Sequence, residues 1–262
     1  MAVAVEQRRK LARIMEGRSW IDLLVLAWLW WGFDKINNLG GEVRQHLAER
    51  HGHDVLHLER ALHAAPELGL NTWLVAHHVL RQIVVAWYED VHGVVTFVVL
   101  GVLWWRRSAS LPALRLAIVA TNLVGLAVFW TWPVAPLRML HAGFVDLVDL
   151  VHGGNGRWPA GAISLDPEQL SALPSLHLAW AVWSSIAVWR MTRRRWLRSL
   201  AVVYPFITVY AVMATANHYL ADCVLGAGVM ALAVLAADRI TGRRGGQALS
   251  GANSGARRST KL

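Results

Sequence analysis

Long runs of apolar residues divide this chain of 262 residues, and few charges fall inside them. A helix needs about 20 mostly apolar residues to cross the hydrocarbon core of a bilayer. The runs predict six such crossings, at residues 20–38, 86–105, 114–132, 174–190, 197–215 and 218–237. A composition of 55% hydrophobic and 16% charged residues favours the same class. We therefore expect an all-α fold, a polytopic membrane bundle of six transmembrane helices.

The first run and the segment after it are less regular than the others. Residues 20–33 are apolar except for Asp22 and carry no small-residue cleavage site, so we expect a retained span and not a signal peptide. Residues 39–85 mix charges with spaced apolar residues, which predicts an extracytoplasmic amphipathic segment. Residues 73–85 could form an interfacial or re-entrant helix, or a further crossing. We expect no crossing there, because with an odd number of spans the clusters of lysine and arginine would no longer lie on one side of the membrane.

Lysine and arginine lie mostly on one predicted side of the membrane. Of the 26 such residues, 19 lie in the N-terminal segment, beside the loops after the second and fourth spans, or in the C-terminal tail. Cytoplasmic flanks retain cations during insertion, so both termini are predicted to be cytoplasmic. Residues 1–19 then form a basic N-terminus, residues 20–240 the membrane domain and residues 241–262 a disordered tail. Nucleic-acid binding is not expected, because the cations lie between apolar runs and not on one soluble face.

This topology brings four polar residues to one level of the membrane. Spans three and five end, and spans four and six begin, on the extracytoplasmic side. The residues beside these ends are Arg138, His177, His218 and Asp222, which are scattered over 85 residues of sequence. The sequence therefore predicts one polar site at the outer boundary of the membrane.

His218 and Asp222 are four residues apart on a predicted helix and therefore share a face. The carboxylate can accept a hydrogen bond from one ring nitrogen and fix the tautomer. The other ring nitrogen is then available as a nucleophile or base. A purely structural polar pair has the same spacing, so the pattern alone leaves both interpretations open.

His177 and Arg138 flank the other two helix ends. His177 follows Pro174 and Ser175 in the first turn of a span, where free amides can cradle a phosphate oxygen and a histidine suits a general acid. A helix cap with an interfacial histidine is the alternative. Arg138 follows two prolines, and its guanidinium can bind phosphoryl oxygens in a bidentate manner or pair with a lipid headgroup.

Three further residues are candidate substrate contacts. The loop 133–173 is predicted to shape the entrance of the site, and Arg157 lies there in a glycine-rich stretch. Tyr88 and His92 precede the apolar core of the second span. They can line a lipid entry or anchor the helix at the interface.

The segments Trp-Pro-Val-Ala-Pro-Leu-Arg at 132–138, Pro-Ser-Leu-His at 174–177 and Asn-His-Tyr-Leu-Ala-Asp at 217–222 resemble the membrane branch of the type 2 phosphatidic acid phosphatase superfamily. Among its members the chain looks most like the bacterial inositolphosphotransferase and inositol phosphorylceramide synthase-like proteins. The resemblance implies that His218 forms a phosphohistidine, that Asp222 orients it and that His177 assists the leaving group. It also implies that Arg138 binds phosphate and that no metal or other cofactor takes part.

Two cations of that superfamily's pattern are missing here, and Leu176 stands where its second motif usually has glycine. Thr131 stands where the first motif usually has a lysine, and Val212 stands where the third usually has an arginine. The phosphate clamp is then expected from Arg138, Arg157 and the amides around Ser175.

These patterns predict an integral-membrane phosphatase or phosphotransferase that uses a phosphohistidine at the extracytoplasmic face of a bacterial plasma membrane. Its substrate would be a lipid phosphate, a phosphodiester or a polyprenyl pyrophosphate, and its other contacts membrane lipids. The sequence indicates no oligomeric state. Two alternatives remain open: a membrane protein that binds a metal or haem through some of its 12 histidines, and a non-catalytic transporter or scaffold.

Overall fold

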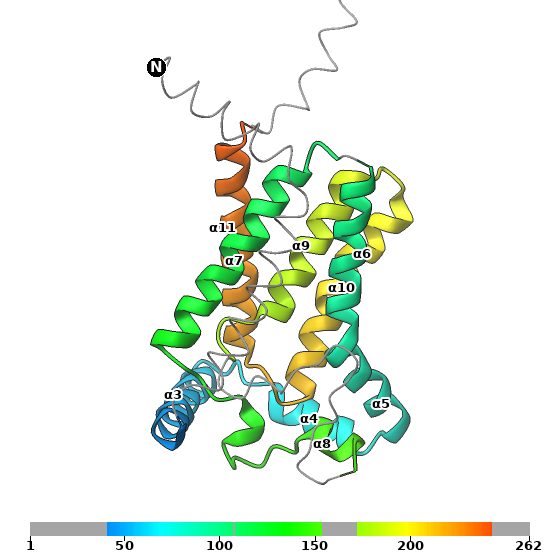
Figure 1. Cartoon of the computed structure of the whole chain (residues 1–262). Helices are drawn as coiled ribbons and strands as arrows, with labels where there is room; N and C mark the ends of the chain where they lie inside the picture. The colour runs from blue at the N-terminus through cyan, green and yellow to red at the C-terminus, as the bar shows by residue number, and fades with distance from the viewer. Residues whose placement is uncertain (1–40, 107, 154–171, 243–262) are drawn as a thin grey trace, which may run out of the picture.

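The computed structural model describes residues 41–106, 108–153 and 172–242. Every regular element in these residues is a helix, and they contain no β-strand. Helices α6, α7, α9, α10 and α11 run side by side as a bundle, and helices α3, α4, α5 and α8 gather at one of its ends (Figure 1). We call this the site end. The prediction of an all-α fold is confirmed for the described part of the chain.

The bundle is made of α6 (His92–Trp105), α7 (Leu111–Thr131), α9 (Leu176–Met191), α10 (Arg195–Ala214) and α11 (Leu220–Ile240). Helix α9 packs against each of the other four. Its Ala179, Trp183 and Ala187 are buried in one apolar core with Leu114 and Met230. The Trp183 indole donates a hydrogen bond of 2.7 Å to the carbonyl oxygen of Leu114, which ties α9 to α7 inside that core.

Four helices within the described residues are long and apolar enough to cross a membrane, namely His78–Trp105, Leu111–Thr131, Arg195–Ala214 and Leu220–Ile240. Their outward faces expose large apolar side chains, among them Phe206 at 71% and Leu232 at 68%. Exposing so much apolar surface to water is unfavourable, whereas its contact with lipid tails is not. The chain therefore has the character of an integral membrane protein.

The predicted six spans compare unevenly with these helices. The third, fifth and sixth spans correspond to α7, α10 and α11 within a few residues. The fourth corresponds to α9, which has 16 residues and is shorter than the length of about 20 that a crossing needs. The first span, residues 20–38, lies outside the described residues. Six crossings and two cytoplasmic termini therefore stay predictions.

The second span begins earlier than the sequence indicated. Helix α5 (His78–Ala86), a π-helical turn (Trp87–Val91) and α6 follow one another without a break. Residues 78–85, which we expected in an interfacial segment, thus belong to the same continuous helix as α6, His78–Trp105. The physical reason is that the π-helical turn accommodates an extra residue, so the helix continues past the acidic residues Glu89 and Asp90 and does not end there.

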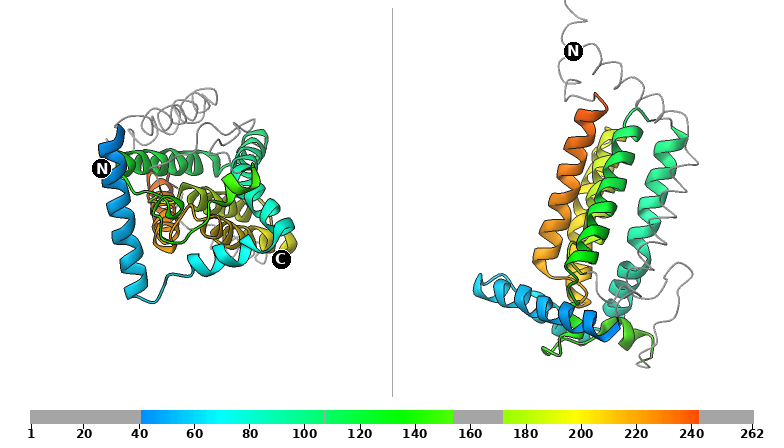
Figure 2. Two further views of the ribbon diagram at one scale, coloured as in Figure 1. Left: turned by 90° about the horizontal axis from the view of Figure 1, so that it is seen from below. Right: turned by 60° about the vertical axis from the view of Figure 1, so that its left-hand side comes forward.

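The amphipathic segment of the prediction, residues 39–85, forms α3 (Gly41–Ala61) and α4 (Glu67–Val75) at the site end, followed by α5. Figure 2 shows α3 lying across the end of the bundle and not along it. The loop after α7 contributes a 3₁₀ turn (Leu137–Met139) and α8 (Leu147–Val151) to the same end. Residues 154–171 of that loop, the N-terminal segment 1–19 and nearly all of the predicted tail lie outside the described residues.

Candidate active site

The first turns of α9 and α11 meet at the site end of the bundle. Ser175 is the N-cap of α9, and its hydroxyl accepts a hydrogen bond of 3.4 Å from the amide of Leu178. The amide of Ser175 donates in turn to the carbonyl oxygen of Asp222 on α11, at 3.1 Å. A Cβ added to Gly226 would lie 2.2 Å from the carbonyl oxygen of Ser175, so only glycine permits this close approach. The two helix starts are thus held together by backbone contacts.

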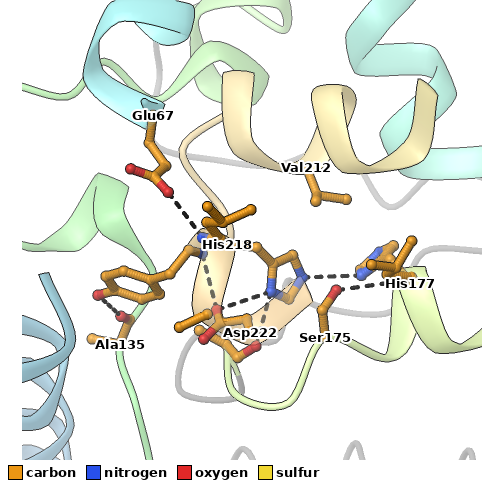
Figure 3. A network of polar contacts seen from close by, with 12 residues as sticks. Glu67, Ala135, Ser175, His177, Val212, His218 and Asp222 are labelled. Carbon is orange, nitrogen blue, oxygen red and sulfur yellow. Dashed lines mark hydrogen bonds and ion pairs between the residues drawn. The ribbon is translucent and has the colours of Figure 1, made fainter. Parts of the chain in front are cut away.

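Two imidazoles face each other across these helix starts. Nδ1 of His177 lies 3.2 Å from Nε2 of His218, although 41 residues separate them in the chain (Figure 3). His218 is buried, with 4% of its surface exposed. The structure therefore brings together the two histidines that the topology predicted at one level.

The second nitrogen of His218 has two acceptors. Nδ1 lies 2.8 Å from the carbonyl oxygen of Ala172 and 3.3 Å from Oδ2 of Asp222. A carbonyl oxygen can only accept, so Nδ1 carries the hydrogen and Nε2 of the neutral ring keeps its lone pair. That lone pair is directed at His177. The contact with Asp222 matches its four-residue spacing, whereas the contact with Ala172 leaves no signal in a sequence because it uses the backbone.

Asp222 joins the histidine to the start of α11. The oxygen that faces His218, Oδ2, also accepts a hydrogen bond of 3.0 Å from the amide of Tyr219, the N-cap of α11. The carboxylate is fully buried, and no described residue hydrogen-bonds to its other oxygen. The orientation of the carboxylate therefore depends on where the first turn of α11 lies.

Two further carboxylates reach this turn from outside the bundle. Oε1 of Glu67, on α4, accepts a hydrogen bond of 2.8 Å from the amide of Leu220. Oε1 of Glu59, on α3, accepts one of 2.6 Å from the amide of Ala221. Burial raises the pKa of Glu59 to about 7 and also raises the pKa of Glu67 above its ordinary value. Sequence reasoning missed both residues, because their partners lie more than 150 positions away.

Tyr88 and His92 lie against His177. The Tyr88 ring stacks on the His177 ring with centroids 4.9 Å apart, and the His92 ring is tilted against it at 4.2 Å. Nδ1 of His92 also lies 3.1 Å from the carbonyl oxygen of Tyr88. The Tyr88 and His92 rings therefore line one side of the His177 ring.

Arg138 is tied to the site through its backbone. Its amide donates a hydrogen bond of 2.9 Å to the carbonyl oxygen of Ala216, two residues before His218. Nε of its buried guanidinium lies 3.5 Å from Oδ2 of Asp146. The structure thus places the arginine at the site end, paired with a carboxylate. Arg157 lies outside the described residues.

The two positions that lack the superfamily's cations have local roles. The Thr131 hydroxyl donates a hydrogen bond of 2.7 Å to the carbonyl oxygen of Ala127 on its own helix. Val212 is fully buried, and its carbonyl oxygen accepts from the amides of Asn217 and His218, at 3.2 Å each. Within the described ranges, no group of three or more His, Cys, Asp or Glu side chains has a geometry that could hold a metal ion.

A family model described as the PAP2 superfamily matches residues 53–236, more than half of the chain. The matched range includes all three motifs and both carboxylates that contact the start of α11. No curated protein and no solved structure matches the chain.

Proposed function

Because the chain belongs to the PAP2 superfamily, we propose that it is a membrane phosphatase or phosphotransferase that acts on a lipid phosphate, phosphodiester or polyprenyl pyrophosphate. The superfamily predicted from the motifs is confirmed, and an inositolphosphotransferase-like subgroup is part of the proposal. The observation that carries the proposal is the distance of 3.2 Å between His177 Nδ1 and His218 Nε2. A single phosphoryl group at this point can contact both rings.

In the proposed reaction His218 is the nucleophile. Its Nε2 lone pair attacks phosphorus, an N–P bond forms, and the P–O bond to the leaving group breaks. Nδ1–H stays bonded to Ala172 and Asp222, and the carboxylate stabilises the positive charge that develops on the ring. Burial of both partners strengthens this interaction, because little water competes with it.

His177 is the proposed general acid and base. Without substrate, the N–H at its Nδ1 can donate to the lone pair of His218, so an incoming phosphoryl group must enter between the two rings. With both of its ring nitrogens protonated, His177 then gives one proton to the departing oxygen and is left neutral. In the second step it removes a proton from the acceptor, whose oxygen attacks phosphorus and breaks the N–P bond. Water as acceptor gives hydrolysis, and an inositol or sugar hydroxyl gives transfer.

The start of α9 is the proposed phosphate cradle. No described residue accepts a hydrogen bond from the amides of Leu176 or His177, and amides at the start of a helix favour an anion. Ser175 completes this turn. We propose Arg138 and Arg157 as additional phosphate contacts, with substrate competing with Asp146 for the guanidinium of Arg138.

Tyr88 and His92 are the proposed contacts on the leaving-group side. Both rings lie against His177, the residue that would protonate the leaving oxygen. Their helix begins at His78 and runs into the membrane bundle, which offers a lipid substrate a path from the bilayer. The proposed partners are therefore the lipid substrate and the membrane lipids around it.

The test is a panel of lipid phosphates, phosphodiesters and polyprenyl pyrophosphates offered to the purified protein with and without inositol. Released phosphate and new phospholipid are measured separately. His218→Ala should abolish both products, whereas His53→Ala, at an exposed histidine of α3, should leave them unchanged. Turnover by His218→Ala at the wild-type rate would refute the proposal.

The site end is proposed to face outward from a bacterial plasma membrane, because most cations flank the opposite end of the predicted spans. Leu62, just after α3 at the site end, is 67% exposed, and Cys223, the only cysteine in the chain, is buried. Leu62→Cys should therefore react with a membrane-impermeant maleimide in intact cells, or in spheroplasts if an outer envelope blocks access. Reaction only after lysis would reverse the orientation.

A further inference from the structure

Three consecutive amides at the start of α11 each donate to a carboxylate. The amide of Tyr219 donates to Asp222, that of Leu220 to Glu67 and that of Ala221 to Glu59. The first amides of any helix lack partners within the helix, and one side-chain cap usually satisfies one of them. Here two of the three acceptors come from other helices, α4 and α3.

The two glutamates are buried where a carboxylate is costly. Glu59 is 3% exposed and Glu67 is fully buried. In each, the second oxygen, Oε2, has no hydrogen-bond partner in the described part of the chain. Burying a half-satisfied carboxylate lowers stability. Apolar side chains would make a more stable contact between α3, α4 and the bundle, so these acids point to a requirement other than stability.

The same two helices hold the turn between α10 and α11 at additional points. Asn71 lies one turn after Glu67 on α4, and its side-chain amide donates to the carbonyl oxygen of Ala214 at the end of α10, at 2.9 Å. On α3, Gly52 approaches the hydroxyl group of Tyr219, which bonds to Ala135 at 2.7 Å. Both sides of the turn that carries His218 are therefore fixed by helices outside the bundle.

We propose that Glu59 and Glu67 are positioning residues that hold the first turn of α11 so that His218 and Asp222 face His177. This proposal rests on the proposed function, to which it adds two residues and the segment that carries them. Oδ2 of Asp222 contacts both the Tyr219 amide and Nδ1 of His218, so a shift of the turn changes the direction of the imidazole.

Filling the start of α11 with protein carboxylates also directs the substrate. A free helix start attracts phosphate, and two such starts would compete for it beside the histidine pair. Glu59 and Glu67 occupy the amides of α11 and leave those of α9 as the phosphate cradle. The phosphoryl group then lies on the His177 side of His218, in line with the lone pair of Nε2.

The test compares variants that keep or remove the acceptor. Glu67→Gln retains a carbonyl oxygen for the Leu220 amide, whereas Glu67→Ala removes it, and Glu59 is treated in the same way. Glu49→Ala is the control, because Glu49 is a glutamate of α3 that pairs with Gln45 on its own helix. For each variant, kcat and KM are measured for the best substrate of the wild type, together with hydrogen exchange of the two α11 amides.

We expect Glu67→Ala to lower kcat by about 10- to 100-fold with little change in KM, because misplacing a catalytic group affects the reaction more than binding. Glu67→Gln should restore most of kcat, and Glu49→Ala should match the wild type. Exchange should accelerate at the Leu220 amide in Glu67→Ala and at the Ala221 amide in Glu59→Ala. Should the alanine variants not fold, Glu67→Asp, whose carboxylate is one methylene shorter, should show the same loss of kcat.

A variant with accelerated exchange at its α11 amide and an unchanged kcat would overturn the positioning role. So would a Gln variant that is as slow as the Ala variant. Failure of the proposed function is a separate result, namely a wild type without turnover on any phosphate compound. In that case ¹⁵N NMR of the His218 ring still decides the structural part, since the Nδ1 resonance should shift in Glu67→Ala, where the bond to Asp222 is disturbed, and stay at its wild-type position in Glu67→Gln.

Discussion

Gly226→Ala should remove most of the activity, because the added methyl group has no room. A Cβ at this position would lie 2.2 Å from the carbonyl oxygen of Ser175, whereas ordinary contact begins at 3.4 Å. Ser175 cannot yield alone, since its amide bonds to Asp222 and its hydroxyl caps α9. The starts of α9 and α11 must therefore separate by about 1 Å.

This separation acts directly on the histidine pair. His177 is two residues after Ser175, and its partner His218 precedes α11, so the gap of 3.2 Å between their ring nitrogens widens by a similar amount. A misplacement of about 1 Å can lower a rate by about 100-fold. We expect Gly226→Ala to insert and fold but to show a kcat lower by about that factor in an assay of phosphate release.

The same helix supplies a matched control. A Cβ at Gly228 meets no atom within 4 Å, so Gly228→Ala should keep the wild-type kcat. It should also raise stability by up to about 1 kcal/mol, the usual gain for alanine over glycine inside a helix. Wild-type kcat in Gly226→Ala would show that the contact with Ser175 does not govern the site.

Three other predictions address charge, orientation and packing. Burial raises the pKa of Glu59 from 4.5 to about 7, with Glu67 and Asp222 facing it. The folded state thus holds this proton more tightly than the unfolded state. The free energy of unfolding should therefore fall by about 3 kcal/mol as pH rises from about 4.5 through 7. Unfolding experiments on Glu59→Gln should show a smaller dependence on pH. Asp222→Asn should lower kcat by at least about tenfold, because its amide oxygen can still accept from Tyr219 and from His218 but carries no negative charge to stabilise the imidazolium; a smaller loss contradicts the role of the carboxylate. Trp183→Phe should lower stability by about 1 kcal/mol through loss of its hydrogen bond to α7, without changing KM.

The meeting of the two histidines could be predicted because it follows from topology. Pro174 and Ser175 mark the start of one helix, and Asp222 marks the first turn of the next. Once both helices start at the same end of the bundle, their first residues must lie close together. Short-range signals of this kind, caps and apolar runs, carry most of the fold.

The supporting contacts could not be predicted, because they join residues that no local pattern connects. Glu59 and Glu67 lie in an amphipathic segment where any acid looks solvent-exposed, yet both are buried against α11. Ala172 contributes only a backbone carbonyl oxygen to His218. Tyr88 reaches His177 because a helix continues through a π-helical turn, and an acidic pair in a sequence normally indicates the end of a span.

The most direct test of the central claim is to trap the phosphoryl group on the protein. A His177→Asn variant, which keeps the nucleophile but lacks the base for the second step, is incubated with substrate labelled at phosphorus and quenched in alkali. We expect a base-stable, acid-labile label on the peptide that contains His218, and no label when His218→Ala is added to the variant. Label on another residue, or turnover in the wild type through a route that leaves His218 unlabelled, would contradict the claim.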